Sequence, residues 1–131
     1  EKNMIRINAW PGFFGKPLVE AAGIDSTLME RATELLQRMG RKPVWVPDVA
    51  GFVNGRVISS IINEAFFALE ESVSTEEEID VAMKLGTNYP YGPFEWGRKI
   101  GLQSVFRLLE RLSAEQSRYE PSSLLKQRAL A

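Results

Sequence analysis

The chemistry open to this chain is limited to oxygen- and nitrogen-bearing side chains other than imidazole, because the sequence contains no histidine and no cysteine. Disulfides and thiolate chemistry are therefore excluded. Only oxygen ligands could hold a metal, so a zinc or haem site is not expected. No Gly-x-Gly-x-x-Gly turn follows a strand pattern, and Gly12, Gly15 and Gly23 have neither its spacing nor its context. The chain alone is not expected to bind a dinucleotide.

Several polar and aromatic groups stand out, and each has a structural interpretation. Glu20 is typical of a partly solvated carboxylate at the end of a strand or loop. Asn54 and Gly55 suit a helix start, because Asn caps a helix and Gly permits tight entry. The run 76–78 of three glutamates indicates a solvated first helical turn. Aromatic packing beneath a proline-rich loop is favoured over a base-stacking or acyl-binding platform for Tyr89, Tyr91, Phe94 and Trp96.

The first fifty residues predict a strand, a helix and a strand. Residues 4–10 alternate as a short strand does, and residues 18–22 fit either an extended piece or a helical turn. A capping box beginning at Thr27 opens an amphipathic helix that Gly40 ends. Residues 44–46 are β-branched and aromatic, which favours a second strand.

The rest of the chain predicts helices. Residues 52 to about 72 lack proline and are apolar over an arc wide enough to be buried on two sides. This helix is expected to pack against its own domain on one face and against another chain or domain on the other. Four shorter helices follow: one capped by Ser74 or Thr75 and ended by Gly86, one from Pro93 to Gly101, one over 102–112, and one opened by Pro121.

Size and charge restrict the possible functions further. A chain of 131 residues with 44% hydrophobic and 25% charged residues is ordinary for a soluble globular protein. The net charge of -1 provides no basic field for nucleic acid, and no apolar stretch is long enough to span a membrane. No leader pattern opens the chain, which begins with Glu1, so a cytoplasmic location is expected.

Four separated elements, in order, resemble the C-terminal part of the L-3-hydroxyacyl-CoA dehydrogenases: Leu18-Val19-Glu20, the stretch 48–52, the stretch 64–80, and Tyr91-Gly92-Pro93-Phe94 leading to Gly101-Leu102. The resemblance implies a mainly α fold, a helical bundle of the 6-phosphogluconate dehydrogenase C-terminal-like type preceded by a short β-α-β remnant. It implies that residues 1–48 end a Rossmann-type domain and that residues 49–131 form a helical dimerisation and substrate-side domain.

The resemblance also implies a reaction, the NAD-linked oxidation of 3-hydroxyacyl-CoA in fatty-acid metabolism. In that family a histidine takes the hydroxyl proton while hydride leaves for NAD, and a glutamate orients the histidine. Glu20 matches that glutamate. Asn8 matches the Asn of the family's strand-end pattern, on the substrate side, and counting back three residues places Ile5 where the histidine should stand.

A second family pattern, Gly-Phe-x-x-Asn-Arg, is only partly kept. Arg56 aligns as a substrate-side residue, but Gly55 takes the Asn position and Asn54 lies one residue early. One step along a helix turns a side chain by roughly 100°, so Asn54 is a displaced match for the catalytic amide. Arg98 stands where the family usually has an acidic residue.

These matches and departures predict a catalytically incompetent fragment, with Glu20 vestigial. It is expected to form a homodimer through residues 52–72, to have acyl-CoA as a possible ligand, and to bind no NAD by itself. The alternative is a non-enzymatic helical protein-interaction module on the same scaffold. A nucleic-acid-binding domain is supported only by scattered pairs such as Arg41-Lys42 and Arg98-Lys99.

Overall fold

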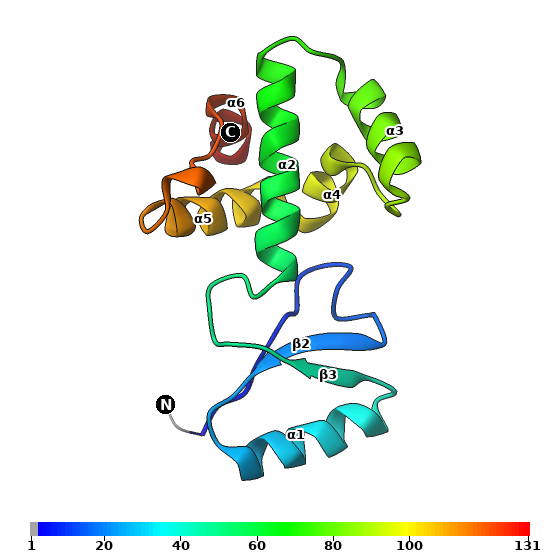
Figure 1. The fold of residues 1–131 in the computed structure, drawn as a ribbon, viewed down its shortest axis with the longest axis vertical. Helices are drawn as coiled ribbons and strands as arrows, with labels where there is room; N and C mark the ends of the chain where they lie inside the picture. Colours follow the sequence, from blue (N-terminus) through cyan, green and yellow to red (C-terminus); the bar gives the residue numbers. More distant parts are fainter. Residues whose placement is uncertain (1–2) are drawn as a thin grey trace. The chain divides into compact units, whose positions relative to one another are not determined.

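The chain folds into two compact units, Glu1–Val53 and Asn54–Ala131, in a computed structural model that describes residues 3–131 (Figure 1). The first unit carries a small sheet and one helix, and the second is helical. The predicted class, a helical bundle preceded by a short β-α-β remnant, is confirmed. Along the chain, the boundary between the units falls between Val53 and Asn54, whereas the sequence predicted a domain boundary after Asp48.

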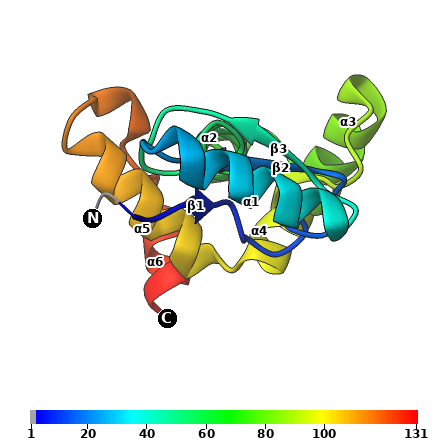
Figure 2. The ribbon, with the colours of Figure 1, turned by 90° about the horizontal axis from the view of Figure 1, so that it is seen from below.

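The sheet unit is built from a crossover. Strand β2 (Leu18–Ala22) pairs in parallel with β3 (Lys42–Trp45), and α1 (Ser26–Arg38) connects them. Strand β1 (Arg6–Ile7) pairs antiparallel to the other side of β2, giving the order β1-β2-β3. Figure 2 shows α1 lying across one face of this sheet. Apolar residues of β2 and α1 form its core: Val19, Ala21, Ala22 and Leu36.

Two details of this unit correct the sequence-based expectations. Asp25, not Thr27, caps α1, because its carboxylate accepts the Leu28 N–H over 2.8 Å and starts the helix about half a turn earlier. The strand predicted over residues 4–10 is shorter. Beyond β1 the Asn8 side chain accepts the Trp10 N–H, a local bond that competes with strand pairing.

The helical unit is organised around α2 (Asn54–Glu70), the long helix in Figure 1. It packs against three of the helices that follow it, α4, α5 and α6. Its core side chains include Ile62, Phe66, Val105, Leu109 and Leu125. The remaining elements are α3 (Glu76–Thr87), α4 (Pro93–Ile100), α5 (Leu102–Ser113), the short 3-10 helix η1 (Ser117–Tyr119) and α6 (Ser123–Leu130).

The ends of α2 lie inside the predicted span of 52–72. Phe52 and Ser72 both have left-handed backbone, with φ of 50° and 56°, so neither continues a right-handed helix. The start of α6 also differs, since Ser122 caps it and Pro121 precedes the cap. The 3-10 helix was not predicted. Along the part of the chain that the structure describes, no helix is long and apolar enough to cross a membrane.

Candidate functional site

The strongest polar constellation of the sheet unit is centred on Glu20 in β2. Its side chain is only 8% exposed, and Asn8, which is 7% exposed, lies beside it. The Asn8 Nδ2 donates to Glu20 Oε2 over 3.0 Å, and the Val53 N–H donates to Glu20 Oε1 over 3.1 Å. Burying a carboxylate is costly without such donors, so these bonds hold Glu20 in place.

The chain around this pair is fixed by its backbone. Asn8 Oδ1 accepts the Trp10 N–H over 3.1 Å, which orients the amide with its Nδ2 toward Glu20. On the other side, Gly51 and Phe52 both have positive φ, and the turn that they form presents the Val53 N–H to the carboxylate. The Val53 donor is a main-chain group, so no side-chain pattern could have predicted it.

A cation and an aromatic ring support the same turn. The Arg6 guanidinium lies 5.1 Å from the centre of the Phe52 ring and pairs with the carboxylate of Asp48. Arg6 and Asp48 are each about half exposed, so their pair contributes little to stability. The cation and the buried Phe52 ring instead hold the turn in position.

The structure changes the expectation for Glu20 and locates Ile5. Glu20 is buried rather than partly solvated, because two N–H donors replace the water it gives up. Asn8 is its side-chain hydrogen-bond partner. Ile5, which the resemblance places at the histidine position, packs toward α1 and not toward the Glu20 side chain. A Cβ added to Gly23 would lie 2.5 Å from Ile5 Cδ1 and 3.0 Å from Met29 Cγ, so Ile5 faces α1.

The other predicted site residues belong to the helical unit. Asn54 is the first residue of α2, as a helix-start interpretation predicts, and Gly55 beside it is buried. The Arg56 guanidinium lies 5.9 Å from the centre of the Tyr119 ring. The structure therefore brings Asn8 and Glu20 together within the sheet unit, and it places Asn54 and Arg56 together on the first turn of α2.

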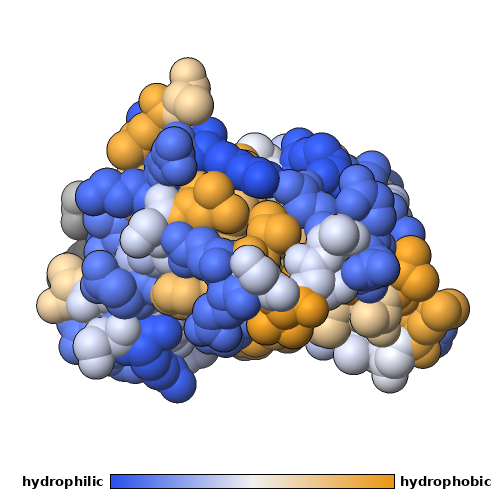
Figure 3. Space-filling view, turned by 90° about the horizontal axis from the view of Figure 1, so that it is seen from above, coloured by the Kyte–Doolittle hydropathy of each residue, from blue (hydrophilic) through white to orange (hydrophobic). Residues whose placement is uncertain are grey.

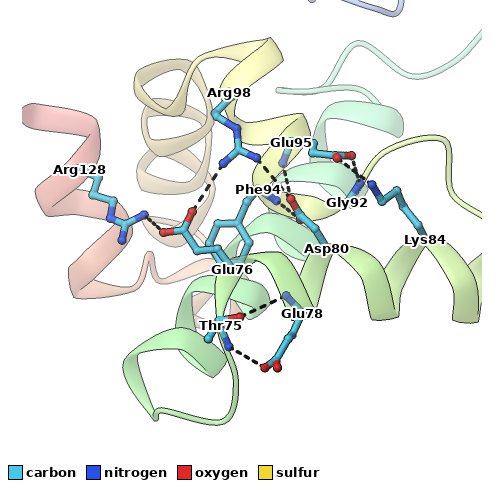
Figure 4. Close-up of polar contacts among 10 residues, drawn as sticks. All are labelled: Thr75, Glu76, Glu78, Asp80, Lys84, Gly92, Phe94, Glu95, Arg98 and Arg128. Carbon is cyan, nitrogen blue, oxygen red and sulfur yellow. Dashed lines mark hydrogen bonds and ion pairs between the residues drawn. The ribbon is translucent and has the colours of Figure 1, made fainter.

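A second constellation joins α3 to α4 (Figure 4). Asp80 is 5% exposed, and its two carboxylate oxygens accept the N–H groups of Phe94 and Glu95 over 2.8 and 3.1 Å. These are the first free N–H groups of α4, so Asp80 caps that helix from a neighbouring one. The sequence analysis did not select Asp80, although its spacing of three residues from apolar Met83 is a signal that could have indicated a buried acid.

The acidic run at the start of α3 is more than a solvated turn. Glu76 pairs with Arg128 of α6 and lies 3.6 Å from Arg98, so it connects three helices. The Ser74 hydroxyl and the Thr75 N–H lower the pKa of Glu78, which forms a capping box with Thr75. Glu77 and Glu78 are exposed, as a solvated first turn predicts, whereas Glu76 is half-buried between its two arginine partners.

 The second acid is Glu95, whose carboxylate accepts from Lys84 Nζ over 2.7 Å and from the Gly92 N–H over 2.9 Å. The Lys84 contact, followed by the Gly92 N–H, lowers the pKa of Glu95 from its ordinary 4.5. Arg98 reaches Asp80 Oδ2 over 3.5 Å, which explains how a cation is accommodated where the family usually has an acid.

The aromatic residues of the loop and α4 pack on one another. The rings of Tyr89 and Tyr91 lie 5.4 and 6.2 Å from the Trp96 ring, and the Phe94 ring lies 5.0 Å from that of Phe66. Trp96 and Phe94 are buried. The predicted aromatic packing is confirmed: Phe94 and Trp96 belong to the core, and the half-buried rings of Tyr89 and Tyr91 pack against Trp96.

The sheet unit does not fit the phosphates of a dinucleotide. Its only parallel crossover among the described residues runs from β2 to α1, the place where a glycine-rich turn would present a helix N-terminus to a pyrophosphate. Here the Asp25 carboxylate accepts the Leu28 N–H at that helix end. A second anion there would be repelled, so no step that involves NAD is assigned to these residues.

One apolar groove lies on the helical unit between α2 and α3. It is lined by Ser60, Ile61, Glu64, Ala65, Ala68, Ile79, Met83 and Pro93. Figure 3, seen from the end where α2 connects to α3, shows apolar residues gathered in patches among polar ones. Large apolar side chains are also exposed near these helices, among them Val57, Val73 and Val81. Exposed apolar surface of this kind is typical of an interaction site.

Comparison with known proteins identifies relatives of one kind. A family model for the C-terminal domain of 3-hydroxyacyl-CoA dehydrogenase matches residues 51–131. The 3-hydroxyadipyl-CoA dehydrogenase of Escherichia coli (strain K12) is 43% identical over 115 residues, covering 86% of this chain and 24% of that protein. The probable 3-hydroxybutyryl-CoA dehydrogenase of Bacillus subtilis (strain 168) is 40% identical over 94 residues, covering 70% of this chain and 33% of that protein.

A solved structure agrees with these relatives. The crystal structure of 3-hydroxybutyryl-CoA dehydrogenase from Escherichia coli K12 superimposes with a TM-score of 0.81 at 40% identity. The match covers 88% of this chain and 26% of that one. The chain therefore spans between 24% and 33% of the length of the two curated relatives.

Proposed function

The chain belongs to the 3-hydroxyacyl-CoA dehydrogenase family, and on that premise we propose that it forms the substrate-side part of an NAD-linked enzyme of fatty-acid metabolism. The ligand class is a 3-hydroxyacyl or 3-oxoacyl thioester of coenzyme A. By itself the chain binds this thioester without oxidising or reducing it. Within the sheet unit the substrate-side residue would be Asn8. Within the helical unit it would be Arg56, with Asn54 as a displaced amide.

The observation that carries this proposal is the buried Asn8–Glu20 pair in a chain without histidine. Oxidising an alcohol requires a group that takes the hydroxyl proton as hydride leaves. A primary amide does not accept a proton in the physiological range, and Glu20 spends both carboxylate oxygens on N–H donors. The site keeps an orienting carboxylate and lacks the base that such a carboxylate would orient.

A binding experiment tests this function. Isothermal titration with acetoacetyl-CoA should give saturable binding that is tighter than the binding of free coenzyme A, because the acyl portion adds contacts. Absence of binding for both compounds, together with capture of a protein partner, would reject the proposal and favour the non-enzymatic interaction module.

We further propose that the chain is a homodimer whose interface includes the α2–α3 groove. The supporting observation is the apolar lining of that groove, from Ile61, Ala65 and Ala68 on α2 to Ile79 and Met83 on α3. Two copies related by a two-fold axis would place the same apolar surface on each side. Covering it removes apolar area from water, which stabilises the pair.

A further inference from the structure

We propose that Asn8, and not Ile5, stands where the related dehydrogenases hold their proton-accepting histidine. The inference rests on the proposed function, since it assigns a residue to that reaction. Residue 8 is then the position that Glu20 orients, and this chain has an amide there in place of a proton acceptor.

The first argument is the strand register. Arg6 pairs with Ala22 and Ile7 pairs with Ala21, and the Asn8 N–H continues the ladder by donating to the Glu20 carbonyl over 2.9 Å. Residues directly opposite in an antiparallel pair place their side chains on the same face. Asn8 and Glu20 therefore share a face, and their side chains meet over 3.0 Å.

The second argument excludes Ile5. Side chains alternate along a strand, so Ile5 lies on the face of Ile7 and not on the face of Asn8. Its Cδ1 lies over Gly23 beside Met29 of α1. An imidazole at position 5 would therefore face α1, on the side of the sheet away from the Glu20 carboxylate.

The third argument is the orientation of the amide. Asn8 Oδ1 is held by the Trp10 N–H, which leaves Nδ2 to donate to Glu20. An imidazole can donate through one ring nitrogen while the other accepts a proton, and a carboxylate on the first nitrogen selects that tautomer. An amide reproduces the donated bond and has no second nitrogen. The Asn8–Glu20 pair thus makes the hydrogen bond that would orient an imidazole and contains no nitrogen that could accept the proton.

The absence of any natural histidine makes this assignment directly measurable. Asn8→His and Ile5→His each create a protein with a single imidazole, whose pKa can be followed by proton NMR across pH. Each is compared with the same variant carrying Glu20→Gln. The nearby Arg6 is paired with Asp48 in all four proteins, so its charge is a constant background.

The expected result is a large response at position 8 only. A carboxylate in contact favours the protonated imidazole, so removing its charge should lower the pKa of His at position 8 by about 1 unit or more. At position 5 the same change should shift the pKa by less than about 0.3 units, because the two side chains lie on opposite faces. A response confined to position 5, or none at position 8, would overturn the proposal.

A smaller substitution covers the case in which Asn8→His does not fold. Asn8→Asp keeps the shape of the side chain but places a second carboxylate against Glu20, so the pair shares a proton with a raised pKa. That variant should be stable at low pH and lose stability as pH rises, and adding Glu20→Gln should abolish the loss. Ile5→Asp should show no such rescue by Glu20→Gln. Absence of rescue at position 8 would contradict the assignment.

The titration uses no thioester, so its outcome is separate from the proposed function. If acetoacetyl-CoA fails to bind while His at position 8 responds to Glu20, the proposed function is rejected and the position facing Glu20 is still identified. If the thioester binds and only His at position 5 responds, the proposed function stands and this inference is rejected.

Discussion

Asn8 and Glu20, which are 12 residues apart, form a buried side-chain hydrogen bond of 3.0 Å between the start of the loop after β1 and the middle of β2. The same two residues also share a backbone bond of 2.9 Å. This double connection fixes the position of the Glu20 carboxylate within the sheet unit. It makes the pair both a structural element of the sheet unit and the centre of the candidate site.

Removing the Asn8 amide should destabilise the protein. Asn8→Ala leaves the buried Glu20 carboxylate with one fewer N–H donor, which costs about 1–3 kcal/mol. Urea unfolding should report this loss. Asn3→Ala removes an amide of the same kind from an exposed position and should change the free energy of unfolding by less than about 0.5 kcal/mol. Equal effects of the two substitutions would mean that the buried pair does not stabilise the fold.

The contact between α3 and α4 predicts a steric effect at Gly92. A Cβ at this residue would collide with the Asp80 side chain that caps α4. Gly92→Ala should therefore lower stability by about 1–3 kcal/mol, as overpacking does. Gly86→Ala is the matched control because nothing lies within 4 Å of its added Cβ. That control should be neutral or stabilising by up to about 1 kcal/mol, since Ala is the better helix former. A neutral Gly92→Ala would show that the Asp80 contact is not fixed.

Glu95 predicts a pH dependence with a defined sign. Lys84 and the Gly92 N–H lower its pKa from 4.5, so its contribution to stability is present above that value and is lost as pH falls through the lower folded pKa. The difference in melting temperature between wild type and Glu95→Gln should be constant above about pH 5.5 and shrink below 4.5. A difference that grows on acidification would contradict the ion pair with Lys84.

The elements of the fold could be predicted from sequence because their signals are local. Periodic apolar residues and terminal Gly, Pro and Thr located the helices of the second unit to within a few residues. The ends of α2 were misplaced because the left-handed backbone of Phe52 and Ser72 leaves no reliable trace in residue type. The 3-10 helix Ser117–Tyr119 is too short to have a periodicity.

The candidate site could be predicted only in part, because its contacts are not local. Glu20 and Asn8 were both selected, but their pairing depends on the register between β1 and β2, which sequence patterns specify weakly in so short a strand. Counting back from Asn8 in the family's strand-end pattern placed the missing base at Ile5, whereas we infer residue 8 from the register. The Val53 N–H and the capping role of Asp80 depend on tertiary contacts and were not predicted.

The proposed dimer can be tested at the α2–α3 groove. Ala68→Glu would place an unpaired charge in the apolar lining and should raise the dimer dissociation constant by at least about tenfold. Analytical ultracentrifugation measures this constant. Leu85→Glu adds the same charge at a side chain that is 82% exposed and lies outside the groove, and should leave association unchanged. Equal effects of both variants, or a wild-type monomer, would reject the proposed interface.

The most direct test of the predicted catalytic incompetence is turnover. Purified chain is mixed with acetoacetyl-CoA and NADH, with the 3-hydroxybutyryl-CoA dehydrogenase of Escherichia coli as the positive control. We predict that the relative oxidises NADH and that this chain does not. Measurable oxidation by this chain that Glu20→Gln abolishes would contradict the account.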